Sequence, residues 1–179
     1  MNIILRKNRN SWAKIGKSVL FAIAFILLWA VNVQAESYEA LYPCLIDLPG
    51  WEAKEPEGMK MEMPGMKMIN ATRSYTQGNK EITAVIVIGN QAMSTPMGAE
   101  GMKMETPEAK VTIERINGFM VQNMYYKKDH EGTIIVYLDR QGTGPAIFSF
   151  SFKELSENEA LNLAKTFDWK MMRDKVKLF

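Results

Sequence analysis

The pattern of hydrophobic positions begins with one unbroken apolar run, VLFAIAFILLWAV, at residues 19–31. Residues 1–18 carry five basic side chains and no acidic one, and Val33-Gln34-Ala35 places small residues where a signal peptidase reads them. The run is shorter than the roughly 20 apolar residues that span a bilayer. We therefore predict a cleaved secretory signal over residues 1–35 and a periplasmic or secreted protein, with an uncleaved N-terminal anchor as the alternative.

Residues 36–179 are predicted to form a single globular domain that opens with a short helix. Apolar residues recur at helical spacing across Ser37–Leu48, and Pro43 inside this segment indicates that the helix is short or broken. Pro49-Gly50 then predicts a turn.

The pattern changes to that of strands from residue 67 onward, and about five to six strands are expected. Glu81–Ile88 is apolar at nearly every position, which predicts a central strand. Gly78-Asn79 and Asn117-Gly118 predict tight turns, whereas residues 90–109 and 141–145 read as connections. The expected strands are Met68–Thr76, Glu81–Ile88, Lys110–Ile116, Phe119–Tyr126, Thr133–Asp139 and Ala146–Phe152.

The last predicted strand carries an aromatic face, because Phe148, Phe150 and Phe152 alternate with serines. We expect these rings to face the core together with Val85 or Val87.

A capping box, Ser156 with Glu159 three residues later, predicts a helix that runs to about Phe167 and packs through the face bearing Leu161. The expected fold class is α+β. A mostly antiparallel sheet would pack against a C-terminal helix and a short N-terminal helix.

Several short motifs support a family resemblance. Pro49-Gly50-Trp51 follows the first helix, Arg73-x-Tyr75 leads a hairpin, and the chain nears its end with Leu163-Ala164-x-x-Phe167-Asp168. Over residues 38–172 this pattern resembles a family of small bacterial periplasmic proteins and the broader Mog1/PsbP-like α/β/α sandwich group. The resemblance implies a sandwich fold and a binding or accessory role, and it carries no catalytic residue.

The charge of the chain depends on the signal. Five of the 22 basic residues lie in it, so the mature chain has 17 basic against 20 acidic residues and a net charge of −3. Such a balance gives no reason to expect a nucleic-acid partner, which requires a basic face on the folded domain.

The sequence holds one cysteine, Cys44, and one histidine, His130. Three interpretations of Cys44 are open: a small buried hydrophobe, a partner in an interchain disulfide, or a lipid-attachment site, which the preceding Leu41-Tyr42-Pro43 disfavours. His130 falls in a predicted turn, and no phosphate-loop, dinucleotide or nucleophile-elbow motif occurs. No catalytic residue and no cofactor other than Cu(I) is therefore expected, and we predict that the protein is not an enzyme.

A repeated tetrapeptide gives the chain its one unusual chemical feature. Gly-Met-Lys-Met occurs at residues 58–61, 65–68 and 101–104. Two copies extend further, because Glu57–Pro64 and Glu100–Pro107 differ only at Met63 and Thr106. Nine of the 13 mature methionines lie in this segment, at positions 59, 61, 63, 66, 68, 93, 97, 102 and 104.

Four interpretations of the methionine-rich segment, residues 58–104, remain open. Alternating methionines can form one face of a half-buried strand, with Met as a flexible filler. An exposed methionine surface can instead contact a protein partner, or absorb oxidants as sulfoxide. Thioether sulfur is also a soft, neutral ligand that favours Cu(I) and Ag(I) over hard cations.

For the metal interpretation we predict one soft-metal surface, with the two distant copies brought together by the fold. The nearby lysines Lys60, Lys67 and Lys103 weigh against it, because they add positive charge beside a cation. The candidate ligands are Met59, Met61, Met63, Met66, Met68, Met102 and Met104.

Overall fold

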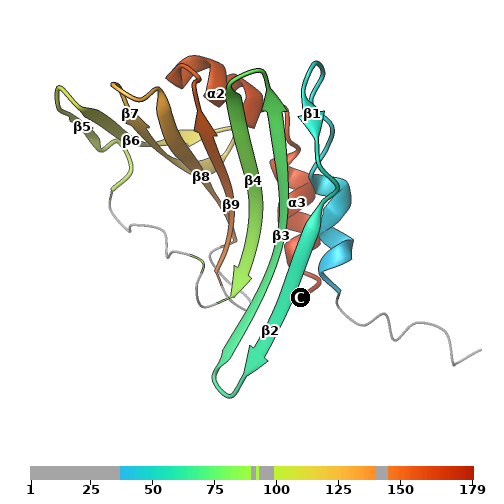
Figure 1. Cartoon of the computed structure of the whole chain (residues 1–179). Coiled ribbons are helices and arrows are strands. Elements are labelled where there is room, and N and C mark those ends of the chain that lie inside the picture. The colour runs from blue at the N-terminus through green and yellow to red at the C-terminus, as the bar shows by residue number, and fades with distance from the viewer. Residues whose placement is uncertain (1–36, 90–91, 93–98, 140–144) are drawn as a thin grey trace, which may run out of the picture. The chain divides into compact units, whose positions relative to one another are not determined.

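Nine strands of the described residues form one antiparallel sheet (Figure 1). The computed structural model describes residues 37–89, 92, 99–139 and 145–179, which all lie in one compact unit. The strand order is β1-β3-β4-β9-β8-β7-β6-β5, and β2 also pairs with β3. The strands are β1 (Glu52–Ala53), β2 (Glu57–Met63), β3 (Met66–Gln77), β4 (Lys80–Gly89), β5 (Lys103–Glu105), β6 (Ala109–Ile116), β7 (Phe119–Tyr126), β8 (Glu131–Asp139) and β9 (Ala146–Lys153).

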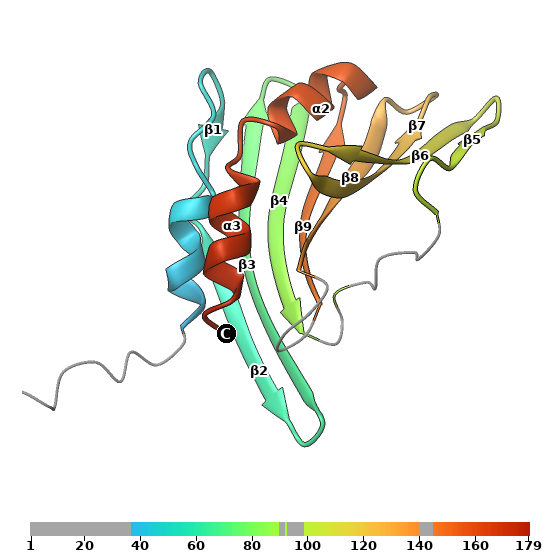
Figure 2. The same ribbon diagram turned by 180° about the vertical axis from the view of Figure 1, so that it is seen from behind.

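Among the described residues, three helices cover one face of this sheet (Figure 2). They are the 3-10 helix η1 (Tyr38–Cys44) and the α-helices α2 (Glu157–Ala164) and α3 (Trp169–Val176). Ser156 caps α2, since its hydroxyl accepts a hydrogen bond from the Glu159 amide, and the Asp168 carboxylate caps α3 in the same way. None of the described helices is long and apolar enough to cross a membrane.

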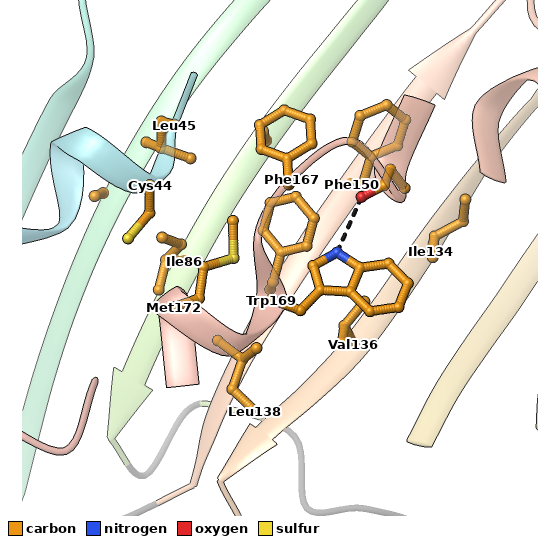
Figure 3. Close-up of a cluster of buried hydrophobic side chains, with 14 of the residues drawn as sticks. Cys44, Leu45, Ile86, Ile134, Val136, Leu138, Phe150, Phe167, Trp169 and Met172 are labelled. Carbon is orange, nitrogen blue, oxygen red and sulfur yellow. Dashed lines mark hydrogen bonds between the residues drawn. The ribbon is translucent and has the colours of Figure 1, made fainter. Parts of the chain in front are cut away.

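The main core lies between the sheet and these helices (Figure 3). Phe150 is fully buried, and its ring centroid lies 5.9 Å from that of Phe167, which precedes α3. Trp169 is buried beside them, and its indole nitrogen donates to the Ala164 carbonyl over 2.9 Å. The turn between α2 and α3 is therefore fixed by aromatic packing together with a satisfied buried donor.

The other face of the sheet points away from the helices, and we call it the distal face. A smaller buried cluster lies on this face, formed by side chains of β6, β7, β8 and β9. It includes Ile113, Met120, Ile135, Tyr137 and Ile147. Directly paired residues of antiparallel strands share a face, so the pairing register assigns the paired strand residues to one face or the other.

The expected α+β class and antiparallel sheet are confirmed, and each of the six predicted strands is present within a residue or a few of its expected bounds. The expected count of five to six strands is too low. The two-residue strand β1 and the three-residue strand β5 are too short to show a period. The methionine pattern predicts a strand at β2 under only one of its interpretations. Residues 141–144 and most of the connection over 90–98 lie outside the described residues.

Two details of the predicted core need correction. The rings of the β9 phenylalanines do face the core, but their partners on β4 are Ile82, Ala84 and Ile86. Val85 and Val87 pair with Ser149 and Ile147 on the distal face. Because β4 is apolar on both faces, its pattern alone does not distinguish them.

One C-terminal helix was predicted, and the structure has two in this region. The predicted helix ends at Ala164 rather than at about Phe167, and Asp168 caps a second helix that was not predicted.

Candidate functional site

Two copies of the methionine tetrapeptide face each other across the β2–β3 hairpin. Pro64 and Gly65 connect the strands, and Gly65 has a φ of +79°, which suits the third position of a type II turn after proline. Met63 pairs with Met66 beside this turn, and Met61 pairs with Met68 one step further along. The turn chemistry therefore sets a register in which methionine meets methionine.

This register gives the hairpin one methionine face. Met59, Met61 and Met63 alternate along β2, and Met66 and Met68 are their neighbours on β3, so all five project from the distal face. Cβ atoms of directly paired residues lie about 5 Å apart, and alternate positions along one strand lie about 7 Å apart. The thioether of methionine ends a flexible chain of three rotatable bonds, so neighbouring sulfurs can converge on one ion. We call these five residues the methionine face.

The exposure of the five side chains distinguishes a buried strand face filled by methionine from an accessible methionine surface. Met59 is 42% and Met63 49% exposed, whereas Met68, which pairs with Gly89 at the end of β4, is 9% exposed. The side chains of Met61 and Met66 are intermediate in exposure. The strand expected under the filler interpretation is present. Met59 and Met63 remain accessible to a ligand, however, and Met68 is the most buried of the five.

The lysines of the hairpin lie on its other face. Lys60 pairs with Ile69 and contacts Glu62 at 3.7 Å, and Lys67 pairs with Glu62 across the hairpin. The Lys67 ammonium group donates to the carbonyl oxygen of Phe179 over 2.9 Å. The objection that lysines add charge beside a bound cation is therefore weakened, because Lys60 and Lys67 project from the opposite face of the hairpin from its methionines.

The third copy of the tetrapeptide lies elsewhere. Met104 belongs to β5, at the opposite end of the strand order, with six strands between β5 and β2. Neighbouring strands are about 4.8 Å apart, so the copies are separated by roughly 30 Å along the sheet. Met102 and Met104 are 42% and 55% exposed, and the register places Met104 on the distal face as well. The expectation of a single surface uniting both distant copies is wrong, because strand pairing carries them to opposite edges. Met93 and Met97 lie outside the described residues.

Cys44 is a core residue. Its side chain is fully buried next to Leu45 and Met172 (Figure 3), and burial raises the pKa of its thiol to about 11. This confirms the buried-hydrophobe interpretation and leaves no accessible sulfur for an interchain disulfide or a lipid in this fold.

His130 occupies the β7–β8 turn with a φ of +48°, and its Nδ1 atom lies 2.9 Å from the Tyr125 hydroxyl. Cys44 belongs to η1, which packs against β2, β3 and α3. The fold therefore holds the one thiol and the one imidazole in different regions. Within the described part of the chain, no group of three His, Cys, Asp or Glu side chains is placed to hold a metal ion.

Sequence reasoning missed a shallow polar hollow of about 220 Å³ on the distal face. The Thr133 and Ser151 hydroxyl oxygens lie 3.1 Å apart within it. The alternation of serine and phenylalanine on β9 was the available signal, but it indicated only which face of the strand is polar. Side chains that line the hollow include Glu81, Thr83, Tyr126, Thr133, Ser151 and Lys153.

Comparison with known proteins adds no relative: no family model, no curated protein and no solved structure matches this chain. The candidate site therefore rests on its own geometry.

Proposed function

We propose that this chain is an exported binding protein that takes a soft monovalent cation, Cu(I) or Ag(I), on the methionine face of the β2–β3 hairpin. The observation that carries the proposal is the pairing of Met61 with Met68 and of Met63 with Met66 on one partly exposed face. Four neutral sulfur donors in adjacent cross-strand pairs match the ligand preference of a soft cation. The predicted signal over residues 1–35 would place this face in a compartment where copper and silver arrive from outside.

The composition of the site has a consequence for pH. Thioethers carry no proton at any accessible pH, whereas thiolate and imidazole ligands must lose one before they bind. Affinity for Cu(I) should therefore stay nearly constant between pH 5 and 8. A site built on His130 or a thiol would instead weaken as the pH falls.

The test is a competition titration of Cu(I) or Ag(I) into the chain from residue 36 onward, under reducing conditions. Leucine preserves the bulk and apolar character of methionine, so a triple change of Met61, Met63 and Met66 to leucine should leave the fold nearly intact. We expect this variant to lose at least about tenfold in affinity. Met102 and Met104 provide the matched control, because their replacement by leucine changes the same tetrapeptide on the far edge and should leave binding unchanged.

Cys44→Ala is the second control. Because the thiol is buried and its pKa is raised, we expect binding in this variant to match that of the unaltered chain. Binding that disappears with Cys44, or that survives loss of the hairpin methionines, would contradict the proposal. The 42% and 49% exposure of Met59 and Met63 also suits a protein-contact surface, and absence of any metal binding in a folded protein would favour that role. The Mog1/PsbP-like resemblance implies binding or accessory functions and agrees with either outcome.

A further inference from the structure

The strand that carries the first tetrapeptide is an open edge. In the described part of the chain β2 pairs only with β3, so the other side of the strand has no neighbouring strand. Glu57–Met63 lies between Pro56 and Pro64 and contains no proline that would block further pairing. Figure 1 shows this strand at the margin of the sheet, running past the helices toward the hairpin tip. An unpaired edge of this length is a template for another strand.

The sequence of this edge is complementary to itself. Met59-Lys60-Met61-Glu62-Met63, laid antiparallel to a second copy and centred on Met61, sets each Lys60 opposite a Glu62. Opposite charges in directly paired positions stabilise a sheet, and like charges destabilise it. A shift of two residues in either direction would set Lys60 opposite Lys60 or Glu62 opposite Glu62. The charges therefore select one register.

The existing contact between Lys60 and Glu62 does not prevent these side chains from pairing with a second copy. Lys60 and Glu62 contact each other at 3.7 Å within one strand, and their side chains are 37% and 67% exposed. Surface pairs of this kind contribute little, so a cross-strand partner can replace them.

We propose that β2 pairs antiparallel with β2 of a second copy, centred on Met61, to give a two-fold dimer with one continuous sheet. Each methionine face then borders the other across the axis, with Met61 beside Met61 of the partner copy. The pairing does not rest on metal binding, because its register follows from the charges and from the open edge. A contact about seven residues long is small, so the dimer is expected to be weak and dependent on concentration.

Strand β5 contains the same Lys-Met-Glu sequence as β2, but it is a less favourable pairing partner. Pairing of β2 with β5 of another copy would also match Lys60 with Glu105 and Glu62 with Lys103, and it would build open-ended chains. However, β5 has only three residues, and Glu105 already accepts a 2.7 Å hydrogen bond from Lys127. These observations favour β2 with β2.

The experiment is sedimentation velocity on the metal-free chain from residue 36 onward, from micromolar to millimolar concentration. The unaltered chain should approach a dimer. Lys60→Glu and Glu62→Lys each turn both attractive pairs into repulsive ones, and each should weaken dimerisation on the order of tenfold or more. An equimolar mixture of the two variants restores opposite charges in this register, so the mixture should dimerise again. The matched exchange Glu105→Lys on β5 should have no effect.

Several outcomes would overturn the proposal. They are a monomer at every concentration, single variants that dimerise as well as the unaltered chain, a mixture that fails to recover, or species larger than a dimer that vanish with Glu105→Lys. A second measurement does not depend on charge. Met61→Cys should form a disulfide-linked dimer under mild oxidation, because directly paired Cα atoms lie about 4.5–5.5 Å apart. Met104→Cys should remain monomeric, and a reversed result would contradict the β2 axis. Because metal is absent throughout, failure here leaves the proposed function untouched.

Discussion

The contact between Gly58 of β2 and η1 determines how the methionine-bearing strand is held on the domain. A methyl group at Gly58 would lie 2.8 Å from Cγ of Tyr38 and 2.9 Å from the carbonyl oxygen of Asn70. The Tyr38 ring is itself held beside Tyr42, with ring centroids 6.0 Å apart. Replacing Gly58 by alanine therefore forces the ring, the backbone of β3, or both to move.

The sign of the effect distinguishes this contact from ordinary strand behaviour. In a strand with room for a side chain, Gly→Ala gains about 0.5–1 kcal/mol by restricting the unfolded chain. Overpacking a filled space costs about 1–3 kcal/mol. The net expectation for Gly58→Ala is a loss of about 0.5–2 kcal/mol in the free energy of unfolding.

Urea denaturation of the variant and the unaltered chain measures this difference, provided that the slope with denaturant is unchanged. In a Tyr38→Ala background most of the overlap is removed, so the cost of Gly58→Ala should shrink. A variant that is neutral or more stable in the presence of Tyr38 would refute the placement of β2 against η1.

Three further predictions concern the core, the thiol and the start of the mature chain. Phe150→Ala should cost about 3–5 kcal/mol in a denaturant melt, whereas Ser149→Ala on the distal face should cost less than about 0.5 kcal/mol, and a loss below about 1 kcal/mol at Phe150 would mean that the assigned faces are wrong. Cys44 keeps its proton in the folded state up to a pKa of about 11 and loses it earlier when unfolded. Stability should therefore fall as the pH rises from about 9 to 11, by up to about 1.4 kcal/mol per pH unit, and Cys44→Ala should remove that part of the slope. Intact-mass measurement on protein from its native host should place the mature N-terminus at Glu36, and a mass that includes residues 1–35 would favour the anchor.

Local signals predicted the local parts of this fold. Asn117-Gly118 marked a hairpin turn, and Ser156 with Glu159 marked the start of α2, because each depends on a few neighbouring residues. The alternation on β9 gave the buried face of its phenylalanines for the same reason.

Nonlocal pairing was beyond the sequence pattern. Strands β2 and β5 lie within nearly identical eight-residue segments, yet β2 pairs with β3 and β5 pairs with β6. That outcome depends on the whole strand order, which includes the pairing of β4 with the distant β9. The alternation of Met59, Met61 and Met63 on one strand face was therefore predictable, whereas their pairing with Met66 and Met68 was not, and the expected union with Met102 and Met104 was wrong.

The most direct test of a soft-metal site on the hairpin is an NMR titration of the chain labelled with ¹³C at the methionine methyl groups. The methyl group is bonded to the sulfur, so its resonance reports binding at each residue separately. On addition of Ag(I) we predict shifts at Met61, Met63, Met66 and Met68, with Met104 and the core residue Met172 unchanged. Shifts confined to Met104, or no shift at the hairpin methionines when the silver is bound, would contradict the account.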